Sequence, residues 1–235
     1  MTRRDRTVLR TSIRRRHLAK LAVVLLGGCI TLTACGPVQL GSAAIVGGQR
    51  ITLSTLATEV SNLNQAYASE KHKVALGFSA NQAPQEVLAW LIVFRVGDEL
   101  GHDLGINLSP AQVQTSLDSL SSEIKQSTGS SLEAEAVAHG VPPNLISTQF
   151  ASYEAIQTAL TTKLSQGQTS TSAQQQVETE LGRYQCLAAK NLNIKISPQF
   201  GRLNYTEFTI VPVANTLSAP GGTVKAASGS FTPPC

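Results

Sequence analysis

The sequence has few charged residues and no long apolar run. Asp, Glu, Lys and Arg make up 14% of its 235 residues, against roughly 25% in an average protein. The net charge of +4 comes from residues 1–34, which carry eight of the 19 basic residues and one of the 15 acidic ones. The remainder holds 11 basic and 14 acidic residues, so it lacks the broad positive surface that binds a phosphate backbone. We therefore expect no nucleic-acid partner.

Recognisable catalytic and cofactor motifs are also missing. The sequence contains no Gly-x-Ser-x-Gly, no Gly-x-Gly-x-x-Gly and no Walker loop, the patterns typical of nucleophile elbows and of phosphate-binding turns. Asp98 and His102 stand four positions apart, the spacing at which two metal ligands share one helix face. We interpret them instead as part of a solvated acidic helix end. The prediction is a protein that is not an enzyme and uses no metal and no cofactor.

The first 34 residues are arranged like an export signal. A basic segment, 1–20, precedes an apolar one, 21–32, which is shorter than the roughly 20 residues that a membrane-spanning helix needs. The sequence then reads Leu32-Thr33-Ala34-Cys35, which resembles the bacterial lipobox, Leu-x-Ala/Gly-Cys. The resemblance implies cleavage after Ala34 and a lipid on the Cys35 thiol. We expect a lipoprotein anchored on the extracytoplasmic face of the cell membrane.

The signal is compatible with two export routes. Arg15-Arg16, followed by His-Leu-Ala-Lys, resembles a twin-arginine signal, which serves the export of folded proteins. A basic segment of this kind fits the general secretion route equally well. Both routes stay open at the level of the sequence.

The four cysteines have different expected fates. Cys29 lies inside the segment that is removed, and Cys35 is the lipidated residue. Cys186 and Cys235 then remain in an oxidising compartment, where a bridge between them and a pair of free thiols are both compatible with the sequence. Helical spacing places Cys186 opposite Val177, so we expect its side chain to face outward.

Hydrophobic spacing predicts a mainly helical domain over 43–212, joined to the signal by a linker, 35–42. Gly47-Gly48 between short apolar runs indicates a hairpin, and Ile194–Ile196 is expected to be a short strand. Apolar residues between them recur at helical spacing. The expected helices begin near residues 52, 84, 110, 132, 143 and 173.

Two segments differ from these amphipathic helices. The run 87–96 is apolar except for Arg95, and a helix that is apolar all round belongs in the centre of a core. The C-terminal segment, 213–235, is rich in Ser, Pro, Gly and Thr and cannot bury enough apolar surface to order itself. We predict a buried central helix and a disordered tail.

Three segments together resemble the N-terminal chaperone domain of the SurA/PrsA group of extracytoplasmic folding factors. They are the opening Ile45-Val46-Gly47-Gly48-Gln49-Arg50-Ile51-Thr52, the link Gly105-Ile106-Asn107-Leu108-Ser109 and the closing Ile194–Leu203. The resemblance implies a five- to six-helix domain closed by a small β element that pairs the chain ends. It also implies a chaperone without the prolyl-isomerase domain of many members, because only 43 residues follow Leu192.

Two functions are compatible with these expectations. One is an ATP-independent chaperone that holds unfolded or extended exported polypeptides near the membrane. The other is a non-catalytic structural or interaction lipoprotein that binds one specific envelope partner. Phe150 and Tyr153 are the candidates for a client groove, whereas Trp90 and Phe94 are expected to fill the core. A broad apolar groove favours the first function, and a small, specific patch favours the second.

Overall fold

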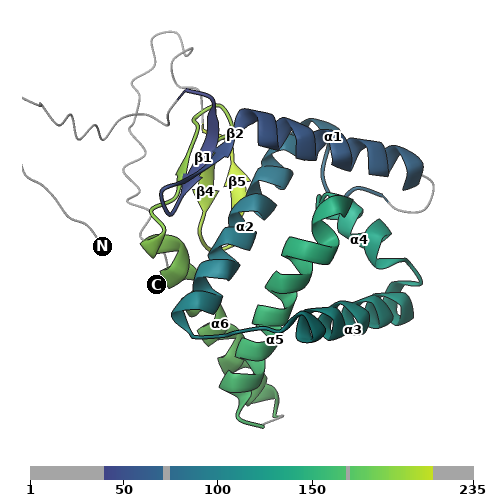
Figure 1. Ribbon diagram of the computed structural model, residues 1–235, viewed down its shortest axis with the longest axis vertical. Coiled ribbons are helices and arrows are strands. Elements are labelled where there is room, and N and C mark those ends of the chain that lie inside the picture. Colours follow the sequence, from purple (N-terminus) through teal and green to yellow (C-terminus); the bar gives the residue numbers. More distant parts are fainter. Residues whose placement is uncertain (1–39, 71–74, 168–169, 214–235) are drawn as a thin grey trace, which may run out of the picture. The chain divides into compact units, whose positions relative to one another are not determined.

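The computed structural model describes residues 40–70, 75–167 and 170–213, all of which belong to one compact unit of the chain, Gly36–Cys235. The predicted signal, the lipidation site at Cys35 and the tail from residue 214 onward lie outside the described residues. The unit is mainly helical with small antiparallel sheets (Figure 1). The predicted fold class is confirmed at that level.

The described chain begins with the expected hairpin. Strands β1 (Ser42–Val46) and β2 (Gln49–Thr52) pair antiparallel. Gly47 and Gly48 form the turn with φ angles of 58° and 78°, a left-handed conformation that glycine adopts without steric cost. The backbone N–H of Gly47 donates to the Leu192 carbonyl oxygen at 2.7 Å, which fixes the turn against a distant part of the chain.

A third strand completes this sheet from the other end of the domain. Strand β3 (Lys195–Ile196) pairs antiparallel with β1 through Ala44–Ile196 and Ile45–Lys195. The strand order is therefore β2-β1-β3, with the first strand of the chain in the centre. The sheet joins segments that lie about 150 positions apart.

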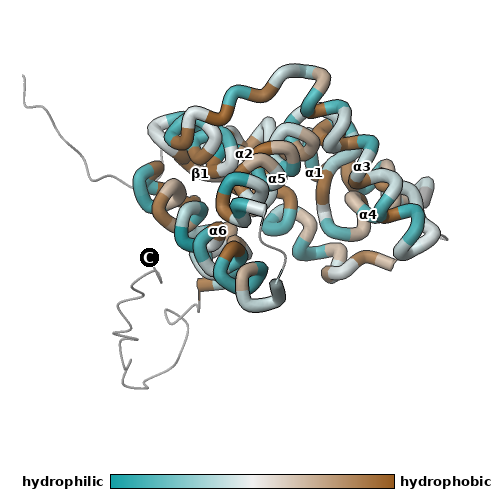
Figure 2. The backbone as a smooth tube through the Cα atoms, turned by 90° about the horizontal axis from the view of Figure 1, so that it is seen from below, coloured by the Kyte–Doolittle hydropathy of each residue, from teal (hydrophilic) through white to brown (hydrophobic). Residues whose placement is uncertain are grey.

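Six α-helices lie between these strands in the described part of the chain. Thr52 begins the first by accepting a hydrogen bond from the Thr55 backbone N–H at 3.0 Å, the usual chemistry of a threonine N-cap. Figure 2 shows hydrophobic and hydrophilic stretches interleaved along α3 and α6, as expected of helices that pack by one face. The helices are α1 (Leu53–Glu70), α2 (Ala83–Asp103), α3 (Pro110–Thr128), α4 (Leu132–Ala138), α5 (Ala151–Ser165) and α6 (Thr171–Asn191).

The fifth helix departs from the single regular helix predicted from Pro143. A 3₁₀ turn, Pro143–Leu145, and a π-helical turn, Ile146–Phe150, precede α5. Leu145, Ile146 and Phe150 are all buried, so the irregular backbone brings several large apolar side chains into the core at the start of the helix. π-Helical turns of this kind occur as single insertions in α-helices, and residue spacing alone does not reveal them.

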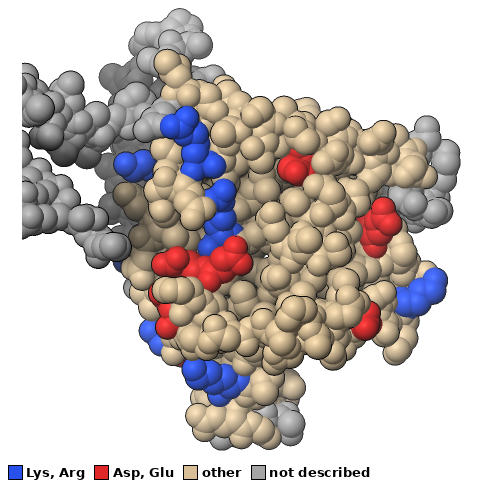
Figure 3. Space-filling model, in the orientation of Figure 1, with Lys and Arg blue, Asp and Glu red and all other residues tan. Residues whose placement is uncertain are grey.

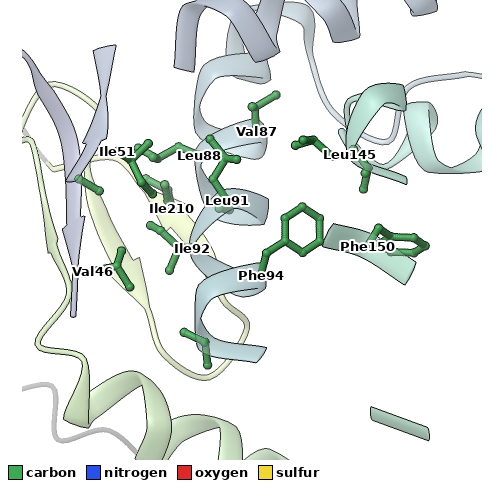
Figure 4. Packing of buried hydrophobic residues seen from close by; sticks show 14 of the residues in the cluster. Val46, Ile51, Val87, Leu88, Leu91, Ile92, Phe94, Leu145, Phe150 and Ile210 are labelled. Atoms are coloured by element: carbon green, nitrogen blue, oxygen red, sulfur yellow. The ribbon is translucent and has the colours of Figure 1, made fainter. Parts of the chain in front are cut away.

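Helix α2 forms the centre of the core, as the sequence predicted for 87–96. It contacts α1, α5, α6, β1 and the second hairpin. In Figure 4, Val46, Ile51 and Ile210 approach it from the strands, and Leu145 and Phe150 lie on its other side. Its buried residues are Ala83, Val87, Leu88, Ala89, Leu91, Ile92, Phe94, Val96, Gly97, Leu100 and Gly101.

A second hairpin follows β3 and packs on α2. Strands β4 (Arg202–Asn204) and β5 (Thr209–Val211) pair antiparallel, and β5 lies against α2. Gly201 precedes the hairpin with φ +123°, and a Cβ at this position would overlap the Val211 carbonyl oxygen. Only glycine allows the two backbones to approach this closely, so this residue sets where the hairpin lies.

No helix in the described ranges combines the length and the apolar character needed to cross a membrane.

Candidate functional site

A cleft lies between α2, α5, α6 and the loop of the second hairpin. Its volume is about 410 Å³, toward the lower end of the range for ligand-binding pockets in proteins. Five separate segments of the chain meet here, because His139 at the C-terminal end of α4 also lines the cleft, so the cleft exists only in the folded domain. The residues that line it are Glu86, Ala89, Trp90, Val93, Val96, His139, Tyr153, Gln185, Thr206, Glu207, Phe208 and Thr209.

Trp90 connects this cleft with the core. Its ring centroid lies 5.6 Å from that of Phe94 and 5.7 Å from that of Phe150, the latter edge-on, a preferred geometry for aromatic pairs. Its indole Nε1–H donates to the His139 carbonyl oxygen at 2.7 Å. The ring is only partly buried, so its remaining surface is available to a ligand in the cleft while its orientation is fixed.

Tyr153 lines the same cleft further along α2, where it packs on Gly97. A Cβ at Gly97 would stand 2.7 Å from the Tyr153 Cδ2 atom, so the missing side chain makes room for the ring. The Tyr153 hydroxyl accepts a hydrogen bond from Gln185 Nε2 at 3.3 Å. Burial, reinforced by the nearby Glu154 carboxylate, raises the pKa of Tyr153 to about 12. The hydroxyl is therefore neutral at physiological pH and retains a proton to donate.

Glu86 contributes a carboxylate from the first turn of α2. Burial raises the pKa of this carboxyl, because water is partly withdrawn from the charged form. Among the described residues, no side chain or backbone group pairs with this carboxylate. The cleft thus contains a half-buried acid that has no charge partner in the described part of the chain.

The hairpin loop closes one side of the cleft with a strained residue. Phe208 has φ +52°, a left-handed conformation that costs a bulky residue roughly 1–2 kcal/mol. The side chain of Asn204 makes two hydrogen bonds within the loop. Its Oδ1 accepts from the Thr206 N–H at 3.0 Å, and its Nδ2 donates to Glu207 Oε2 at 3.2 Å. These bonds hold the loop in the shape that places Phe208 at the cleft.

Some of the aromatic residues discussed in the sequence analysis lie where they were predicted, and others do not. Phe94 is buried, as predicted, and Tyr153 lines the cleft. The expected groove position of Phe150 is corrected, because this side chain is 9% exposed and packs in the core against the rings of Trp90 and Phe94. Trp90, expected in the core, packs against the core and also lines the cleft. Phe208 was missed because no sequence pattern marks a loop residue of this kind.

Cys186 also differs from its predicted outward orientation. It is 2% exposed and takes part in a disulfide bond, whose other cysteine lies outside the described residues. The prediction was wrong because it assumed one apolar stripe along α6. The last turns of the helix are enclosed over a wider arc, with Ala188 and Ala189 buried beside Cys186. The predicted partner, Cys235, lies outside the described residues.

The Asp98–His102 pair stays apart from the cleft. The His102 side chain is 86% exposed and lies 3.7 Å from Asp103 rather than on Asp98. Burial raises the pKa of Asp98, and Arg95 partly offsets this shift. Within the part of the chain that the structure describes, no group of three or more His, Cys, Asp or Glu side chains could hold a metal ion.

Comparison with known proteins adds no relative: neither a protein-family model, nor a curated protein, nor a solved structure matches this chain.

Proposed function

We propose that this chain is a non-catalytic, lipid-anchored extracytoplasmic protein whose helical domain binds a short segment of one envelope partner in the cleft at Trp90. The observation that carries the proposal is the cleft itself. Aromatic surface from Trp90 and Phe208 lies there beside the Glu86 carboxylate, which has no partner among the described residues. Recognition sites typically combine an apolar lining with a few polar groups that fix orientation.

The rest of the surface supports one confined site. Large apolar residues that are exposed in the described ranges are Leu40, Leu53 and Val213. They belong to separate segments and include no aromatic side chain. Binding through many weak contacts would need a broad apolar face, whereas this distribution fits one short segment at one place.

A second candidate is the ATP-independent chaperone that holds unfolded exported chains. Charged groups are sparse over the face seen in Figure 3, and such a surface would not select clients by charge. The resemblance to the SurA/PrsA group also supports this candidate. In that interpretation, the β1–β3 pair would be the element that closes the domain, and Cys35 would supply the membrane anchor, which raises the local concentration of clients.

Site-specific photocrosslinking in the native envelope tests the two candidates. A photoreactive residue replaces Val93 in the cleft or, as the matched control, Gln114 on the exposed face of α3. One discrete adduct from position 93 and none from position 114 supports the specific partner. A broad series of adducts from position 93 supports the chaperone. Equal labelling from both positions contradicts a role for the cleft.

A further inference from the structure

The charge of the cleft has one sign. Glu86 and Glu207 both line it, and no Lys or Arg is among its described lining residues. His139 is the remaining ionisable group apart from Tyr153, and its Nε2 lies 3.4 Å from the Glu135 carboxylate on its own side of the cleft. His139 is therefore engaged by an acid of its own, and a ligand meets an acidic site.

The Glu86 carboxylate is the less compensated of the two acids. Glu207 accepts a hydrogen bond from Asn204, whereas Glu86 has no such donor among the described residues and is half-buried. A carboxylate that has lost part of its water without gaining a partner raises the free energy of the unoccupied domain. A positively charged ligand would supply the missing partner.

Apolar surface lies directly beside this acid. Trp90 follows Glu86 by four positions, one turn along the same face of α2, and Val93 continues that face. Phe208 faces them from the hairpin loop. An indole ring also attracts cations through its face, with Arg the commonest partner. The site therefore combines an acid, an aromatic ring and aliphatic side chains within one helix face and one loop.

From this complementarity we infer that the cleft recognises a polypeptide segment with an arginine or lysine flanked by apolar residues, its cation at Glu86 and Trp90. The inference rests on the proposed segment-binding function and specifies its ligand. The long aliphatic stem of Arg or Lys packs on apolar surface while its charged end reaches an acid. Glu207, at the rim, adds attraction over a longer range.

Binding of defined peptides to the full-length chain in detergent tests the inference. Trp90 is the only tryptophan, so its fluorescence reports occupancy of the cleft for any peptide without tryptophan. Three blocked heptapeptides differ at two positions: Ala-Leu-Arg-Phe-Arg-Leu-Ala, the same peptide with Gln for both Arg, and the same with Glu. We expect the Arg peptide to bind at least fivefold more tightly than the Gln peptide and the Glu peptide to bind most weakly.

Variants locate the charge that is recognised. E86Q should reduce affinity for the Arg peptide about fivefold, equivalent to about 1 kcal/mol, and leave the Gln peptide unchanged. E207Q should have a smaller effect. E178Q, which removes an exposed acid of α6 outside the cleft, is the matched control and should change nothing. Far-ultraviolet circular dichroism checks that each variant is folded.

The outcomes separate the two levels of the proposal. Equal affinity for the Arg, Gln and Glu peptides overturns the charge inference and leaves segment binding in place. A loss in E178Q as large as in E86Q also overturns it, because net charge alone would then explain the effect. Free argininamide binding as tightly as the Arg peptide would overturn the role of the flanking apolar residues. No response of Trp90 to any peptide overturns both the charge inference and the proposed function.

Discussion

Helices α2 and α3 have similar lengths and are stabilised in different ways. α2 has 21 residues, eleven of them buried, whereas α3 has 19 residues and none that is buried. α2 is apolar on nearly every side, and α3 has a single apolar stripe whose members are all partly exposed. That stripe consists of Val113, Leu117, Leu120 and Ile124.

The two helices also differ at their ends, where α3, the helix without buried residues, is the one with side-chain caps. α2 begins without a side-chain cap. α3 begins with Ser109 and Gln112, which exchange side-chain and backbone hydrogen bonds in a capping box. It ends at Gly129, a left-handed C-cap whose carbonyl accepts from Lys125 Nζ at 2.9 Å. Burial thus stabilises the helix that carries the cleft, and local signals stabilise the peripheral one.

Core truncation should produce the largest difference between the two helices. Leu88 is 0% exposed, so Leu88→Ala should lower the free energy of unfolding by about 2–5 kcal/mol through lost burial and a cavity. Leu117→Ala on α3 should cost about 1 kcal/mol or less, because the side chain is already partly in water. Urea unfolding measures both. Equal losses would contradict the assignment of α2 as the main source of stability.

An added methyl group on the core helix α2 should give the next largest change in stability. Gly97→Ala places a methyl group 2.7 Å from a Tyr153 ring atom, and overpacking of this kind should cost about 1–3 kcal/mol. Gly182 on α6 has open space where a Cβ would lie, so Gly182→Ala should stabilise the helix by up to about 1 kcal/mol. If tight packing at Tyr153 is the cause, thermal unfolding should show a lower melting temperature for Gly97→Ala and a higher one for Gly182→Ala. A stable Gly97→Ala protein would show that the ring can move.

Loss of a cap should affect α3 more than any change to its exposed face. Ser109→Ala removes the side chain that accepts from Gln112, and should lower the free energy of unfolding by about 1 kcal/mol. Ser119→Ala, in the middle of the same helix and exposed, should be neutral or slightly stabilising, because alanine is the better helix former. Helical content during urea unfolding provides the measurement. The reverse order would mean that α3 does not depend on its cap.

The contact between α3 and α5 should give the smallest effect, through pH. Burial, and then the Glu123 carboxylate, raise the pKa of Glu154 from its ordinary 4.5. The folded state binds the proton more tightly than the unfolded state, so stability decreases as pH rises above 4.5 toward the raised pKa and is constant above it. Glu154→Gln should remove this decrease and add roughly 0.5 kcal/mol at pH 7. A variant with the same stability as the parent at pH 4 and pH 7 would contradict it.

The same contrast explains which parts of the fold the sequence predicts well. Helices α3 and α4 begin at the predicted residues 110 and 132, and α2 begins one residue before the predicted 84. Caps, prolines and glycines mark these ends, and such signals act locally. The helix ends that such signals mark are therefore predictable from the sequence.

The cleft was predicted less well, because it depends on packing between distant segments. On a helix that is apolar all round, periodicity does not show which side meets solvent, so Trp90 could not be distinguished from Phe94. Phe150 is buried within a π-helical turn that nothing in the sequence marks. Phe208 adopts a left-handed conformation that its residue type argues against, in a loop whose side-chain hydrogen bonds from Asn204 the sequence does not reveal.

The pairing of β1 with β3 has a consequence for the order in which the domain can form. Ile45 and Lys195 are partners in the sheet. Because the chain is synthesised from the N-terminus, β1 is made long before β3, the strand that pairs with its second edge. During that interval, β1 has only β2 beside it, and its other row of N–H and C=O groups is open to water or to another chain. Closing so long a loop also slows folding. Completion of the sheet is therefore a late event, and it waits for almost the whole described domain to be delivered.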